Sequence, residues 1–131
     1  MQPNHVVLWL GHRETHIIAF AGDTSEAPVI VHATQQPDHH VGNTGTTNAA
    51  EPREYYEKII DKIREIPQWL VAGPADAKLF FTRHLHRRHA HLGAKLIGLE
   101  TVDQPSDGQL LGFARKYFAS PGLSVDAMAS A

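Results

Sequence analysis

Hydrophobic residues change their spacing near residue 50, and this change constrains the fold more than any other feature of the sequence. Before it, three short runs rich in β-branched residues span 5–10, 14–20 and 28–33, separated by glycine-containing turns. Runs of this kind predict antiparallel strands that follow one another in a meander. After it, apolar residues recur at spacings of three and four over 51–66, which predicts an amphipathic helix that ends at Pro67.

The second half of the sequence alternates strand-like and helical patterns. The short apolar run 68–72 predicts a buried parallel strand, 74 to about 91 a second helix, and 95–102 another strand. Ser106 and Gln109 have the spacing of a capping box and open a last helix. The element order is therefore β-β-β-α-β-α-β-α. It predicts an α/β fold of the ribonuclease H-like kind, with a mixed sheet and helices on its faces.

The length of 131 residues fits one domain, which we expect over 1–118, followed by a flexible tail over 119–131. The chain has no cysteine, and this excludes disulfides and thiolate metal sites. No apolar run approaches the roughly 20 residues of a membrane helix, and no export signal is recognisable at the N-terminus. The sequence therefore predicts a cytoplasmic protein without membrane contact.

Positive charge is concentrated in one segment, although the net charge of the chain is only -2. Residues 77–99 contain five lysines and arginines and no acidic residue. Such a patch attracts an anionic partner, but it is also typical of a solvated helix face. If the partner is RNA, the predicted contact residues are Arg83, Arg87, Arg88, His84, His86 and Lys95.

The stretch TRHLHRRHAHL, residues 82–92, is rich in histidine as well as arginine. At 100° per residue, Arg83, His86 and Arg87 point away from the apolar stripe, and His84 lies at the flank of the exposed side. The histidines do not converge on this helical wheel, so we expect no metal and no cofactor here, but metal binding through convergence in the tertiary structure stays open. Arginine side chains hold phosphate oxygens well, and the exposed face lacks interleaved aromatic rings, which favours contact with the backbone of structured RNA.

Two longer stretches resemble a known family. HHVGNTGTTNAAEPREYYEKIIDKI, followed by PQWLVAGPADAKLFFTRHL, is similar to the middle domain of archaeal and eukaryotic class-1 peptide-chain release factors and of Pelota. The nearest resemblance is to short bacterial release-factor-like proteins of that superfamily. In the family a short apolar strand ends in Gly-Pro, and a lysine follows on the next helix. Gly73, Pro74 and Lys78 match this pattern.

The loop before the first helix departs from the release-factor pattern. Those factors carry Gly-Gly-Gln there, and this sequence has no such tripeptide. Ester hydrolysis is therefore not expected, nor is a codon-reading domain, since the chain begins at the first strand. By similarity to Pelota, the resemblance implies a non-catalytic factor that binds the ribosome, rRNA or tRNA. The matching loop residues are His39, His40, Gly42, Asn43, Thr44, Gly45, Thr46 and Thr47.

Two other classes of function stay open. A metal-dependent nuclease or hydrolase would use carboxylates around divalent ions, and the candidates are Glu14, Asp61 and Asp107. That set is incomplete because the fourth strand carries no acid. The other class is a protein-interaction module, a homodimer formed through an exposed edge strand.

Overall fold

The computed structural model of the protein describes residues 2–33 and 53–119. Within them, strands and helices combine around a mixed sheet, so the predicted α/β class is confirmed. The predicted loop residues 39–47 and the tail after Ala119 lie outside the described residues. The elements are β1 (His5–Leu10), β2 (Glu14–Ala21), β3 (Thr24–Ser25), β4 (Val29–His32), α2 (Arg53–Ile63), β5 (Gln68–Gly73), α3 (Ala77–Arg88), the 3-10 helix η2 (Ala90–Lys95), β6 (Leu96–Thr101) and α4 (Asp107–Ala119).

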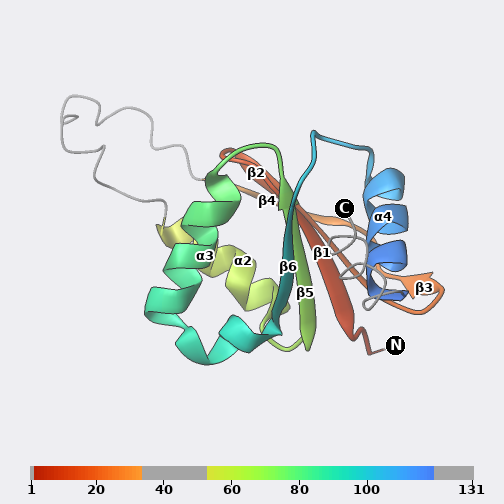
Figure 1. Cartoon of the computed structure of the whole chain (residues 1–131), viewed down its shortest axis with the longest axis horizontal. Helices are drawn as coiled ribbons and strands as arrows, with labels where there is room; N and C mark the ends of the chain where they lie inside the picture. The colour runs from red at the N-terminus through yellow and green to blue at the C-terminus, as the bar shows by residue number, and fades with distance from the viewer. Residues whose placement is uncertain (1, 34–52, 120–131) are drawn as a thin grey trace, which may run out of the picture.

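The sheet has the order β3-β2-β1-β5-β6, with β4 also paired to β2 (Figure 1). β1 and β2 are antiparallel, whereas β1, β5 and β6 run parallel to one another. The predicted meander is therefore present as β1-β2-β4. Its last connection contains an additional short strand, β3, which pairs with the end of β2 after a turn at Gly22, where φ is +57°.

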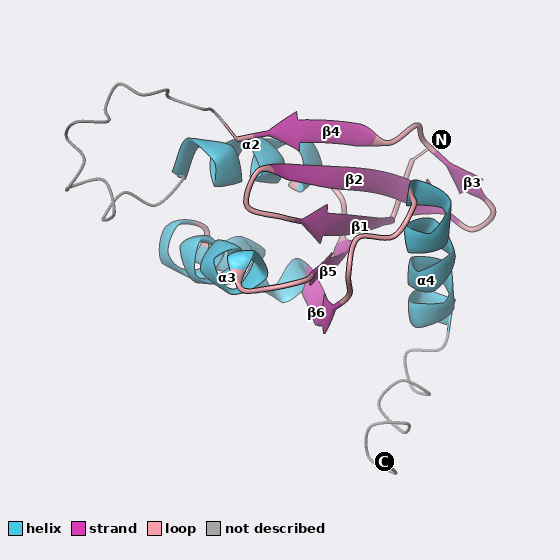
Figure 2. Ribbon diagram, turned by 90° about the horizontal axis from the view of Figure 1, so that it is seen from above, coloured by secondary structure: helices cyan, strands magenta, loops and turns pink. Residues whose placement is uncertain are grey.

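Helices cover both faces of the sheet. α2 and α3 lie on one face and α4 lies on the other (Figures 1 and 2). Alternate residues of β1 enter the two cores: Leu8 and Leu10 pack toward α2 and α3, and Val7 and Trp9 pack toward α4. Because both faces are covered, the strand is a continuous apolar run rather than an alternating one.

The ends of two helices bear on the site described below. α3 was predicted to reach about residue 91, but it ends at Arg88, because His89 has φ -139° and ψ 53°. The backbone then continues into η2. At α4 the predicted capping box is confirmed: the Ser106 N–H donates to Gln109 Oε1 at 3.0 Å, and the Gln109 N–H donates to Ser106 Oγ at 3.1 Å.

Gly73 ends β5 where that strand passes very close to β1. A Cβ atom at this position would lie 2.5 Å from the carbonyl oxygen of Leu10. We expect Gly73→Ala to lower the free energy of unfolding by about 1–3 kcal/mol, because backbone atoms have to move apart. Urea unfolding followed by circular dichroism measures this loss.

Gly112→Ala is the matched control for Gly73→Ala. Gly112 lies within α4, and a Cβ atom there would meet nothing within 4 Å. This second variant is expected to be neutral or to gain up to about 1 kcal/mol from helix propensity. Equal effects of the two substitutions would contradict the close approach at Gly73.

Candidate functional site

The basic residues of α3 form one exposed surface. Arg83, His86, Arg87 and Arg88 are exposed, while Phe81 and Leu85 are fully buried under the same helix. None of the three arginines makes an ion pair with another residue in the described ranges. Their guanidinium groups are therefore available to an external anion. We call Arg83, Arg87 and Arg88 the arginine surface.

Arg83 is partly fixed in place. Its guanidinium carbon lies 5.5 Å from the centre of the Phe80 ring, and Phe80 itself packs against the core beneath α3. This contact orients the side chain through a cation–π interaction. Since Phe80 is held by the core and by Arg83, the ring is not offered as a platform for base stacking.

Two residues of the predicted RNA-contact set have other partners. His84 is only 3% exposed, and its Nε2 atom lies 2.6 Å from Glu57 Oε2. Its predicted place at the flank of the exposed side is wrong. Lys95 is half-buried and donates from Nζ to the carbonyl oxygen of Arg64 at 2.6 Å. The exposed members of the set are thus the arginine surface and His86.

The family-motif lysine has a structural role in this molecule. Lys78 is 7% exposed, and its ammonium group donates to the carbonyl oxygens of Gly73 and Ala75. These bonds close the turn between β5 and α3 at Pro74. The Gly-Pro and lysine of the motif therefore form one local unit in which the side chain supports the turn.

Histidines from the end of α3 meet a carboxylate of α2. Glu57 Oε2 lies 2.6 Å from His84 Nε2 and 2.8 Å from His89 Nε2. The expectation that the histidines do not converge was therefore wrong. The helical-wheel prediction was wrong because His89 lies beyond the last residue of α3. Its side chain therefore does not point in the direction that a continued helix would give it.

The same contacts set the charge on Glu57. Burial by itself would raise the pKa of the carboxyl group, but the hydrogen bonds and charges of His84 and His89 outweigh it and lower the pKa. Glu57 therefore remains ionised beside the two rings. We call Glu57, His84 and His89 the histidine–glutamate cluster.

The acidic residues of the nuclease alternative do not assemble. Glu14 Oε2 lies 2.7 Å from His16 Nε2, and Asp107 Oδ1 lies 2.9 Å from His16 Nδ1. Asp61 is on α2, across the sheet from Asp107, and pairs with Arg64 at 3.5 Å. The three acids therefore cannot surround a common pair of metal ions, and two of them instead bind a histidine that sequence reasoning missed. The sequence did contain a signal for His16: it lies two residues after Glu14, which places both side chains on one face of β2.

His16 is charged in this arrangement. Each ring nitrogen faces a carboxylate oxygen, and since carboxylates only accept, both nitrogens carry protons. Burial alone would lower the pKa of His16, but its hydrogen bonds and charge interactions with Glu14 and Asp107 raise it above 6.5.

This raised pKa makes part of the stability dependent on pH. The stabilisation from His16 is fully present below about pH 6.5 and is lost as the pH rises through the raised pKa of the folded state. The difference in free energy of unfolding between the wild type and His16→Gln should therefore shrink between about pH 6 and 8. Denaturant titrations across this range measure it. A difference that stays constant with pH would contradict a charged His16, and Asp107→Asn should weaken the pH dependence.

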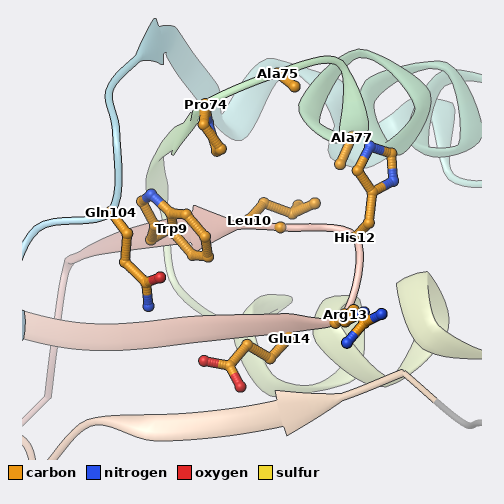
Figure 3. Close-up of a pocket in the computed structure, with 10 residues that line it drawn as sticks. Trp9, Leu10, His12, Arg13, Glu14, Pro74, Ala75, Ala77 and Gln104 are labelled. Carbon is orange, nitrogen blue, oxygen red and sulfur yellow. The ribbon is translucent and has the colours of Figure 1, made fainter.

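A cavity of about 310 Å³ opens at the carboxyl ends of β1 and β5 (Figure 3). Trp9, Pro74 and Gln104 line one end of it and His12 the other. The Trp9 Nε1 atom is buried and has no hydrogen-bond partner within residues 2–33 and 53–119. Most of the lining is apolar, but Glu14, whose carboxylate pairs with His16, also lines the cavity.

The strand edges bear on the interaction-module alternative. β4 lies at the edge of the sheet, and its Val29 and Ile30 side chains are 41% and 44% exposed. A homodimer through this edge stays a prediction.

None of the helices in the described part of the chain is both long enough and apolar enough to span a membrane.

The fold of this chain occurs in Pelota, in a translation termination factor and in a factor of RNA quality control. No protein-family model matches the sequence, and no curated protein matches it. Among solved structures, the chain is similar to Pelota of Archaeoglobus fulgidus, with a TM-score of 0.66 and 13% identity over 99% of this chain and 36% of that one. It is also similar to the archaeal translation termination factor aRF1, with a TM-score of 0.54 and 13% identity over 95% of this chain and 41% of that one.

The structure is also similar to that of a yeast protein. Dom34 of S. cerevisiae, a translation termination-like factor involved in RNA quality control pathways, aligns with a TM-score of 0.58 and 7% identity over 97% of this chain and 38% of its own. The chain thus spans about two fifths or less of the length of these proteins. At these identities the likeness establishes the shared fold. The resemblance to release factors and Pelota seen in the sequence is supported at that level.

Proposed function

We propose that this protein is a non-catalytic, translation-associated factor that binds structured RNA of the ribosome through the arginine surface. The observation that carries the proposal is the exposure of three arginines on one rigid helix, without acidic partners among the described residues. The likeness of the fold to Pelota, aRF1 and Dom34 supports ribosomal RNA as the anion. Such a role would be performed in the cytoplasm.

The chemistry of the surface favours phosphate over other anions. Arginine guanidinium groups bind phosphate oxygens in a bidentate manner, and α3 presents three of them with His86. Since Phe80 is occupied by Arg83, the surface offers charge rather than stacking. Contact with the sugar–phosphate backbone of folded RNA fits this composition better than recognition of single-stranded bases. The loop over 39–47 stays a predicted second contact.

Sedimentation with ribosomes tests the proposal. The wild-type protein is expected to pellet with purified ribosomes through a sucrose cushion at about 50 mM salt and to be released as salt rises. Arg83→Ala, Arg87→Ala and Arg88→Ala combined in one variant should abolish pelleting. The control variant removes the same three charges elsewhere, at Arg13, Lys62 and Lys116, which are also exposed.

The control variant distinguishes binding through the arginine surface from attraction that depends on total charge. If both triple variants lose binding equally, attraction depends on total charge and the arginine surface is not the contact. If the wild type fails to pellet at low salt, the proposal is wrong and the arginines are a solvated helix face. Pelleting of the wild type and control together, with loss in the arginine variant, supports it.

A further inference from the structure

The histidine–glutamate cluster has the donors of a metal site. One ligand atom from each of Glu57, His84 and His89 lies within 4.8 Å of the others. Both histidines present Nε2 to the carboxylate, at 2.6 and 2.8 Å from the same oxygen. All three donors therefore point to one small volume between α2 and the end of α3.

The spacing suits a transition-metal ion after a small adjustment. Ligands of a tetrahedral zinc ion with bonds of about 2.0 Å stand about 3.3 Å apart. The hydrogen-bonded atoms here are 2.6 and 2.8 Å apart, so the donors need to separate by about 0.5–0.7 Å. His84 is buried and fixed against Tyr56, with ring centres 5.4 Å apart, whereas the Glu57 side chain is 39% exposed and free to shift.

We propose that Glu57, His84 and His89 bind a zinc ion. Two imidazole nitrogens and one carboxylate suit zinc, whereas magnesium and calcium require mostly oxygen ligands. A surface cavity of about 470 Å³ is lined by Glu57 and His84 together with Arg53, Lys58 and Arg88. Three protein ligands leave a fourth position, and the cavity gives water access to it.

The zinc site does not depend on the proposed RNA contact. None of its ligands belongs to the arginine surface, so either proposal can fail while the other stands. The ion would join the first half of α2 to the C-terminal end of α3. Because binding occurs only in the folded state, zinc should also raise the thermal midpoint of unfolding.

Calorimetric titration of the full chain with zinc tests the site. The protein is freed of metal with a chelator and carries no polyhistidine tag. One zinc ion per chain is expected, with an increase in the thermal midpoint. Glu57→Gln and His89→Ala should each weaken binding about 100-fold or more, since even residues that only support metal ligands contribute about 10–100-fold. Cobalt in place of zinc should give the absorption bands of a four-coordinate ion.

The control is His86→Ala, because His86 is exposed on the same helix and, among the described residues, is not a hydrogen-bond partner of Glu57. It should bind zinc as tightly as the wild type. Far-UV circular dichroism establishes that each variant is folded, and both ligand substitutions are at partly exposed side chains. Absence of stoichiometric binding in the wild type overturns the proposal. So does an equal loss in the His86 variant, or unchanged affinity in both ligand variants.

Discussion

Alanine at Trp69 is expected to lower the free energy of unfolding by about 5 kcal/mol. The side chain is fully buried in the core beneath α2 and α3. Its Nε1 atom also donates to the carbonyl oxygens of Ile63 at 3.1 Å and Ile66 at 2.7 Å, at the end of α2. The substitution therefore leaves both a cavity and two carbonyl groups without this donor. For a domain with a total stability of about 5–15 kcal/mol, much of the population can unfold.

Trp69→Phe separates the two contributions. Phenylalanine keeps most of the apolar volume and removes only the N–H donor, so a loss of about 2 kcal/mol is expected. Phe113→Ala is the control, because that ring is 36% exposed, and it should cost less than about 1 kcal/mol. Urea unfolding followed by far-UV circular dichroism gives all three values. A loss below about 2 kcal/mol for Trp69→Ala would contradict the packing described here.

The second large effect concerns salt. If Arg83, Arg87 and Arg88 each neutralise one phosphate, the logarithm of the binding constant should fall with the logarithm of salt concentration at a slope of about -2 to -3. Affinity for ribosomes would then decrease about 16- to 64-fold between about 50 and 200 mM salt. Filter binding or sedimentation at several salt concentrations measures the slope.

Single substitutions test how much each arginine contributes to the salt dependence. Each arginine replaced by alanine should reduce the steepness of the slope by about one. The variant lacking Arg13, Lys62 and Lys116 should keep the slope of the wild type, because none of those residues belongs to α3. A slope near zero in the wild type, or one that the arginine substitutions leave unchanged, would contradict phosphate contact by this surface.

Local patterns predicted most of the secondary structure. The first strand was placed at its observed bounds, and the capping box at Ser106 marked the start of α4 correctly. The exposure of Arg83 and Arg87 followed from the helical period of α3. The unpredicted pieces were β3 and η2, which are short and depend on how the chain turns between longer elements.

Contacts between distant residues were not predictable in this way. His84 was placed near the exposed side, but it is buried against Glu57, which lies 27 residues earlier. His16 and Asp107 are 91 residues apart and meet because α4 packs beside β2. No spacing in the sequence encodes either pairing, since each depends on how separate elements pack on the sheet.

The sequence by itself determined the kinds of element, their order and the basic exterior of α3. These follow from hydrophobic period, capping residues and charge, all of which act over a few neighbouring positions. Only the tertiary structure decided which distant ionisable groups meet: Glu57 with two histidines on one side of the sheet, and His16 with Asp107 on the other. The reason is physical. Backbone preferences are local, whereas a binding site needs side chains whose separation is set by the packing of whole helices and strands.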